Sequence, residues 1–188
     1  MTETIHKEYA KLRRQPFLVP LGLPIALGLL LLAILAWVVL SASTTTVYVI
    51  RHAEPASKGD SSLSLAGELR AERLREVFGS APRGQALDAI VVSEERRTQD
   101  TARPLANALG VPVIVVPSAE PAAMARRALS EFHGGRVLII GDAAGLPDIV
   151  AALSGATVPA VSDADFGTVF VVARPRYSPA AVSVLRLP

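Results

Sequence analysis

Arg51 and His52 directly follow a short apolar, β-branched run at residues 47–50, with the letters V-Y-V-I. Catalytic groups often lie where such a strand meets its loop. An imidazole can attack phosphorus in line when donors neutralise the phosphoryl oxygens, and a neighbouring arginine supplies a fork of such donors. The pair therefore indicates phosphoryl transfer, although a lone histidine at a strand end is more often a structural residue.

A second cluster of polar residues follows the next apolar run. Ser93 ends that run, and the letters E-E-R-R-T-Q-D-T-A follow over residues 94–102. This spacing resembles the S-x-x-x-R-T-x-x-T-A signature of the histidine phosphatase superfamily, which has the phosphoglycerate-mutase-like fold. The resemblance implies that His52 is the nucleophile and that Arg51 and Arg97 hold the phosphoryl oxygens. It also places Ser93 among the expected substrate-binding residues.

The resemblance extends over nearly all of the chain after residue 46. Residues 63–67 (L-S-L-A-G) look like the L-T/S-x-x-G opening of the family's first helix, and residues 165–167 (D-F-G) look like its acidic-aromatic approach to a late strand. Only residues 117–135 separate two of the expected strands, which is similar to the compact branch that includes phosphohistidine phosphatases. The resemblance therefore implies the α/β fold of this family.

The chain departs from the family pattern at Asp142. After the apolar run of residues 137–140 the family usually shows Gly-His, and that second histidine donates to the bound phosphate, whereas this chain reads Gly141-Asp142 followed by two alanines. An ionised carboxylate repels phosphate, and two like charges ~4 Å apart cost about 4 kcal/mol at an effective dielectric constant of ~20. We expect Asp142 to line the substrate pocket and to weaken it.

The proton donor for the leaving group is expected among three carboxylates. The resemblance implies an acidic residue near the histidine, and Glu120, in the loop after the third strand, is the first candidate, ahead of Glu54 and Glu94. Each of these residue types is more often a solvated surface carboxylate than a catalytic acid. No carboxylate-histidine spacing of the kind that metal sites show links His52 to the other histidines, so neither a metal nor a cofactor is expected.

Two functional hypotheses from different classes remain open. In the first, the protein hydrolyses phosphomonoesters through a phosphohistidine on His52, weakened by Asp142, and its substrate is a phosphorylated small molecule or an envelope component. In the second, it is a catalytically silent pseudophosphatase that serves as an accessory or scaffolding subunit of a membrane complex, with an integral membrane protein as its partner.

The elements that must position these residues alternate between β-branched runs and helical patterns, which is typical of a sheet covered by helices. The expected fold class is a three-layer α/β/α sandwich with a mostly parallel sheet, preceded by one transmembrane helix. Strands are predicted at residues 46–50, 89–92, 111–116, 136–140, 168–173 and 182–187. Helices are predicted at residues 64–78, 94–109, 121–132 and 146–153.

The N-terminal region predicts a membrane anchor. No charged residue occurs between Arg14 and Arg51, and residues 17–40 are almost wholly apolar; at ~1.5 Å per residue they reach about 36 Å, enough to cross a hydrocarbon core of roughly 30 Å. A buried core helix is one alternative, but such a helix would show a polar face, and this segment has none. A signal peptide that is cleaved near the small residues 41–43 is a stronger alternative than the core helix.

The predicted organisation is a basic cytoplasmic tail (1–16), a transmembrane helix (17–40), a linker (41–46) and a histidine-phosphatase-like domain (47–188). Because the basic flank precedes the helix, we expect the N-terminus in the cytoplasm and the domain outside it, in the periplasm if the cell is Gram-negative.

Charge and cysteine content exclude other classes of function. After the first 14 residues the chain has 15 basic and 15 acidic residues. Such a balanced domain has no basic stripe that would bind a nucleic-acid backbone by counterion release, so no nucleic-acid partner is expected. The absence of cysteine excludes disulfides and thiolate catalysis and does not distinguish a reducing from an oxidising compartment.

Overall fold

The computed structural model of this chain describes residues 19–41, 43–57, 61–82 and 84–187. The chain divides into two compact units between Ala42 and Ser43, and each is described by itself. The predicted basic tail of residues 1–16 lies outside the described residues.

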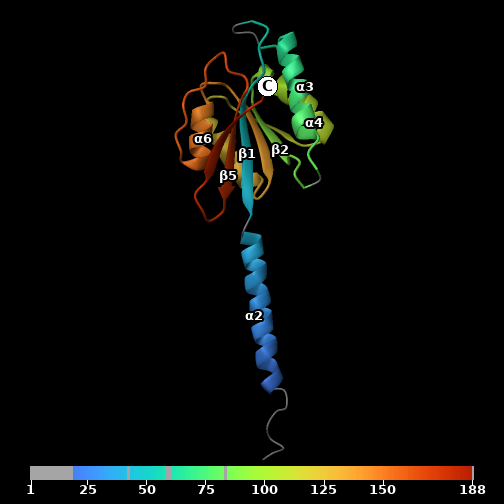
Figure 1. Cartoon of the computed structure of the whole chain (residues 1–188), viewed down its shortest axis with the longest axis vertical. Coiled ribbons are helices and arrows are strands. Elements are labelled where there is room, and N and C mark those ends of the chain that lie inside the picture. The colour runs from blue at the N-terminus through green and yellow to red at the C-terminus, as the bar shows by residue number, and fades with distance from the viewer. Residues whose placement is uncertain (1–18, 42, 58–60, 83, 188) are drawn as a thin grey trace, which may run out of the picture. The chain divides into compact units, whose positions relative to one another are not determined.

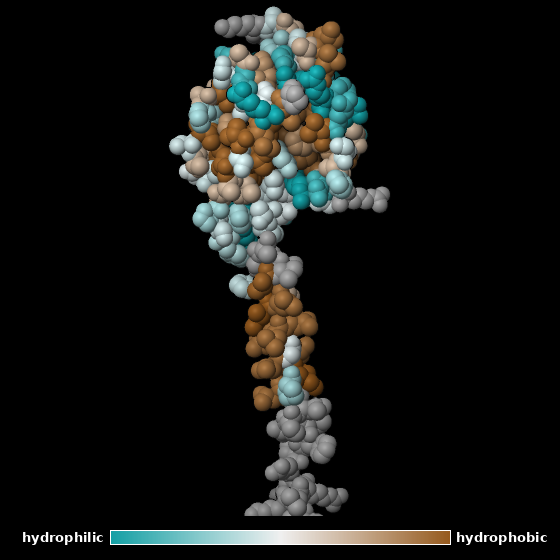
Figure 2. Space-filling model, viewed as in Figure 1, coloured by the Kyte–Doolittle hydropathy of each residue, from teal (hydrophilic) through white to brown (hydrophobic). Residues whose placement is uncertain are grey.

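The first unit contains helix α2 (Val19–Ser41), which has no acidic residue in its first turn and no basic residue in its last. Its described side chains, those of residues 22–38, are all exposed, and the helix presents a hydrophobic surface in Figure 2. The predicted span of residues 17–40 extends beyond what is described. Across the described parts of the chain, no helix is long and apolar enough to cross a membrane. The transmembrane helix therefore stays a prediction.

The second unit is built on a six-stranded sheet in the order β3-β2-β4-β1-β5-β6. Strands β3, β2, β4 and β1 pair in parallel, and β5 pairs antiparallel with both β1 and β6, so the sheet is mixed. This confirms the α/β class. The strands are β1 (Thr44–Arg51), β2 (Ala89–Ser93), β3 (Val113–Val116), β4 (Arg136–Gly141), β5 (Thr168–Pro175) and β6 (Ala181–Arg186).

Helices cover both faces of the sheet, with α3 and α4 on one side and α6 on the other in Figure 1. Because successive strand residues point to opposite faces, Val47 and Val49 of β1 pack in the core beneath α5 and α6, whereas Ile50 packs in the core beneath α3 and α4. The helices of this unit are α3 (Leu65–Gly79), α4 (Arg96–Leu109), α5 (Pro121–Glu131) and α6 (Leu146–Ser154).

Several element boundaries differ from the sequence prediction by one or two residues, and three of these differences have a local reason. Strand β1 begins at Thr44, within the predicted linker of residues 41–46, because it pairs with β5 from its first residue. Strand β3 begins at Val113, after Pro112, whose ring nitrogen cannot donate to a ladder. Helix α4 begins at Arg96 because Glu95, with φ −70° and ψ 135°, still has extended backbone.

The carboxyl ends of three neighbouring parallel strands meet at one edge of the sheet. Arg51 at the end of β1 is in register with Gly141 at the end of β4, and Val92 near the end of β2 is in register with Ile140. The loops after these strands, which are distant in sequence, therefore start side by side. Loops at this edge are where open α/β sheets usually bind ligands.

Candidate active site

The imidazole of His52 is buried at the end of β1, with the residue only 2% exposed. Its Nδ1 lies 2.7 Å from the carbonyl oxygen of Ala53, and because a carbonyl only accepts, Nδ1 carries the proton of the neutral ring. This leaves the lone pair on Nε2, which lies 3.4 Å from Oδ1 of Asp142. Burial lowers the pKa of His52 against the opposing hydrogen bond to Ala53, so the neutral, nucleophilic form is favoured.

The guanidinium of Arg51 is held beside this ring by backbone and aromatic contacts. Its Nη1 donates to the carbonyl oxygens of Asp163 at 2.6 Å and Ser162 at 3.3 Å, and its Cζ lies 4.1 Å from the centre of the Phe166 ring. Desolvation lowers the pKa of Arg51, although it remains a cation. Its buried Nε has no hydrogen-bond partner. A guanidinium cation fixed beside His52 in this way suits an incoming anion.

The polar residues of the Ser93 motif shape the start of α4. Ser93 Oγ lies 2.9 Å from Thr98 Oγ1, and Thr98 in turn donates to the carbonyl oxygens of Ser93 and Glu95 at 3.0 and 2.7 Å. Thr101 Oγ1 accepts a hydrogen bond from the backbone N–H of Ala53 at 3.0 Å. These bonds tie the first turn of α4 to the loop that carries the histidine.

Ser93 itself lies outside the lining of the histidine pocket. The residue is buried and lines a neighbouring hollow that it shares with Asp142 and Gly145. Its predicted contact with substrate stays a prediction, and the bonds above support a positioning role.

Arg97 lies between two carboxylates. Its Nη2 donates to Oδ1 of Asp142 at 3.0 Å and forms an ion pair with Oε2 of Glu95. The same Asp142 oxygen is the one that faces His52. Partial burial, followed by the negative charge of Asp142, raises the pKa of Glu95. Asp142 therefore sits where a phosphate oxygen would have to bind both Arg97 and His52.

Sequence reasoning missed Glu95. Its only sequence signal is its place two residues before Arg97, where a carboxylate at a helix start is ordinarily a solvated cap.

These groups surround one open pocket with a volume of about 490 Å³. It brings together four predicted site residues, Arg51, His52, Arg97 and Asp142, and the remaining walls come from loops on either side. The lining consists of Arg51, His52, Pro55, Ser57, Arg97, Asp142, Ala143, Ala144, Asp163 and Phe166.

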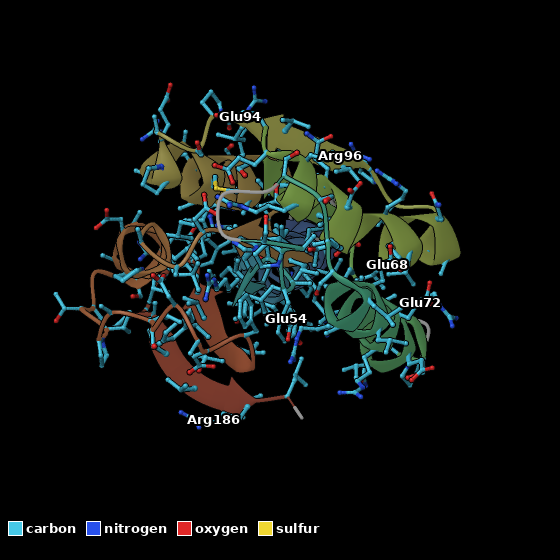
Figure 3. All side chains as sticks on the ribbon, turned by 90° about the horizontal axis from the view of Figure 1, so that it is seen from above. Glu54, Glu68, Glu72, Glu94, Arg96 and Arg186 are labelled. Atoms are coloured by element: carbon cyan, nitrogen blue, oxygen red, sulfur yellow. The ribbon has the colours of Figure 1, made fainter. Side chains whose placement is uncertain are left out.

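The three predicted proton donors are not part of this lining. Glu120 is the exposed N-cap of α5, without a side-chain capping bond. Glu54 accepts two bonds from Arg70 Nε, at 2.9 and 3.0 Å, and Glu94 accepts from Ser118. Figure 3 shows Glu54 and Glu94 well apart, toward α3 and α4 respectively. Within the described ranges, no three or more His, Cys, Asp or Glu residues are grouped so that they could hold a metal ion.

Comparison with known proteins agrees with this geometry. Residues 47–120 match the model of the histidine phosphatase superfamily (branch 1). Among curated proteins, no sequence matches the chain.

Solved structures share the fold at low sequence identity. The protein histidine phosphatase SixA complexed with tungstate is 18% identical, with a TM-score of 0.53 over 75% of this chain and 96% of that one. A mycobacterial glucosyl-3-phosphoglycerate phosphatase is 16% identical, with a TM-score of 0.59 over 77% and 100%. Bacillus stearothermophilus YhfR is 17% identical, with a TM-score of 0.52 over 68% and 90%.

Proposed function

We propose that this chain, of which residues 47–120 match the model of the histidine phosphatase superfamily (branch 1), is a member of that superfamily and hydrolyses phosphomonoesters through a phosphohistidine on His52. The observation that carries this proposal is the orientation of the imidazole. Its Nδ1 is committed to the Ala53 carbonyl at 2.7 Å, which leaves the Nε2 lone pair in the pocket that Arg51 and Arg97 also line.

The reaction has two balanced steps. The Nε2 lone pair forms a bond to phosphorus while the P–O ester bond breaks, and the departing oxygen takes up a proton. Water then attacks phosphorus, the N–P bond breaks, and inorganic phosphate and neutral His52 are released. Arg51 and Arg97 neutralise the phosphoryl oxygens in both steps. Glu120, the predicted proton donor, lies outside the pocket lining, so the departing oxygen takes its proton from solvent water that enters the open pocket.

The substrate class is a phosphorylated small molecule or an exposed phosphoryl group of an envelope component. The open pocket of about 490 Å³ has room for a phosphoryl group together with part of its carrier. The comparison structures include a glucosyl-3-phosphoglycerate phosphatase, whose name supports a phosphorylated small molecule as the substrate.

Turnover of an aryl phosphate by the full-length chain tests this function. His52→Ala should abolish turnover, whereas His133→Ala, which changes an exposed histidine after α5, should leave it within about twofold. Equal turnover in the parent and in His52→Ala would overturn the mechanism.

A membrane anchor with a cytoplasmic N-terminus is the second part of the proposal. It is supported by the lack of charge between Arg14 and Arg51 and by the apolar side chains of α2, of which Leu23 is 74% and Trp37 64% exposed. A reporter that is active only outside the cytoplasm should be active when fused after Pro188. The mature protein should also begin near Met1; a mature start near Thr44 would show that a signal peptide had been cleaved.

The catalytically silent alternative is favoured by one observation, the Asp142 carboxylate 3.0 Å from Arg97 and 3.4 Å from His52. In that case the domain acts as a subunit of a membrane complex. Millimolar phosphate or vanadate should then give no thermal shift, because only a ligand that binds the folded state stabilises it. An integral membrane protein should also co-purify in mild detergent.

A further inference from the structure

Glu95 is the residue of the pocket region that the proposed reaction leaves unused. It is the N-cap of α4, yet its side chain makes no capping hydrogen bond. Its carboxylate instead forms an ion pair with Nη2 of Arg97, and this is the same nitrogen that donates to Asp142 at 3.0 Å. The side chains are only partly exposed, Glu95 at 31% and Arg97 at 23%, so water screens the ion pair incompletely.

The positive charge of Arg97 is therefore already neutralised before any ligand binds. Its Nη2 forms ion pairs with both Glu95 and Asp142, while its buried Nε has no hydrogen-bond partner. With both carboxylates ionised, Arg97, Glu95 and Asp142 together carry one net negative charge. A phosphoryl dianion must therefore compete with Glu95 for Arg97 and approach two carboxylates at the same time.

We propose that Glu95 sets the anion affinity of this pocket: as a carboxylate it competes with the ligand for Arg97, and by taking up a proton it releases Arg97 to the ligand. A dianion and a proton then bind together. The inference rests on the proposed phosphate pocket and goes beyond it, because it assigns a proton to a residue outside the family motif.

The charged groups around Glu95 support this direction. Arg97 on α4 and Asp142 after β4 contact each other and flank it. The other charged or titratable groups of the pocket lining are Arg51, His52 and Asp163. Partial burial and the charge of Asp142 raise the pKa of Glu95, against the opposing effect of Arg97. Glu95 is thus the carboxylate of this group for which uptake of a proton is supported.

Sulfate binding to the full-length protein as a function of pH tests the inference, because sulfate stays a dianion over the range used. Between about pH 5 and pH 8, the parent's Kd should rise about tenfold per pH unit once Glu95 has ionised. Glu95→Gln, which keeps the shape and removes the charge, should bind at least about tenfold more tightly at the alkaline end and lose most of the pH dependence.

Two control variants assign the effect to Glu95. Glu131→Gln removes another arginine-paired carboxylate, the partner of Arg127 on α5, and should behave like the parent. His52→Gln removes the imidazole and should keep the pH dependence, since the proton resides on Glu95. Loss of the pH dependence in His52→Gln would move the proton to the histidine and overturn the inference.

Unchanged sulfate affinity and pH dependence in Glu95→Gln would overturn the inference, as would a parent whose affinity does not depend on pH. If Glu95→Gln fails to fold, carbon NMR of the Glu95 carboxyl in the parent decides, with a pKa at or below the ordinary glutamate value refuting the proposal.

Failure of the proposed function would look different. Sulfate binding would follow the expected pattern while no turnover depended on His52, whereas absence of sulfate binding in every variant at every pH would overturn both proposals.

Discussion

Replacing Asp142 with asparagine or histidine separates a repelling charge from a missing donor. The carboxylate lies 3.0 Å from Arg97 and 3.4 Å from His52, so a bound phosphoryl oxygen would lie within about 4 Å of it. Two such charges repel by about 4 kcal/mol at an effective dielectric constant of ~20. The side chain is 26% exposed, and screening together with the Arg97 ion pair leaves about 1–2 kcal/mol, or about 5–30-fold in Kd.

Asp142→Asn should therefore bind phosphate or vanadate about 5–30-fold more tightly than the parent. Asp142→His should match that gain and also exceed Asn in turnover, because one oxyanion donor is typically worth ~10²–10³ in rate. Ala143 and Ala144 line the same pocket without side-chain donors, which limits how far the rate recovers. Calorimetric titration of vanadate and hydrolysis of an aryl phosphate measure the two effects.

Asp148→Asn is the matched control, because it removes an exposed carboxylate from the first turn of the adjoining helix α6. It should change neither affinity nor turnover by more than about twofold. If both Asp142 variants bind and turn over like the parent, then Asp142 does not silence the pocket and the assumed phosphate position is wrong.

Three further outcomes test the packing and titration around the site. Thr101→Val leaves the buried N–H of Ala53 without its acceptor and should lower the free energy of unfolding by about 1–3 kcal/mol in urea denaturation, with an intact m-value. Gly67→Ala places a Cβ against the carbonyl oxygen of Glu54 and should cost about 1–3 kcal/mol in the same assay, whereas a neutral result would mean that this loop yields freely. Because burial lowers the pKa of His52, unfolded chains bind its proton first as pH falls. Its contribution to stability is then complete above about pH 6.5 and declines below it, and an NMR titration should find the pKa of the His52 imidazole below the ordinary histidine value.

The local elements and the motif residues follow from the sequence alone. Each strand predicted from β-branched runs is present, and helices α3 to α6 begin and end within two residues of their predicted bounds. Period-2 and period-3.6 hydrophobic patterns report which residues face a core, and this is a local property. It was also predictable that Arg51, His52 and Arg97 lie close together, because the loops that follow neighbouring parallel strands start at the same edge of the sheet.

Strand direction and side-chain partners were decided only in three dimensions. Strand β5 pairs antiparallel with β1, and a buried strand shows the same apolar run in either direction. The partners of the carboxylates were also not predictable from the sequence. Of the predicted proton donors, Glu54 accepts hydrogen bonds from Arg70 and Glu94 accepts one from Ser118. Glu95, which was not predicted, forms the ion pair with Arg97. A carboxylate's role depends on which cation the fold brings within about 4 Å, and the sequence, which lists charges in chain order, does not contain that distance.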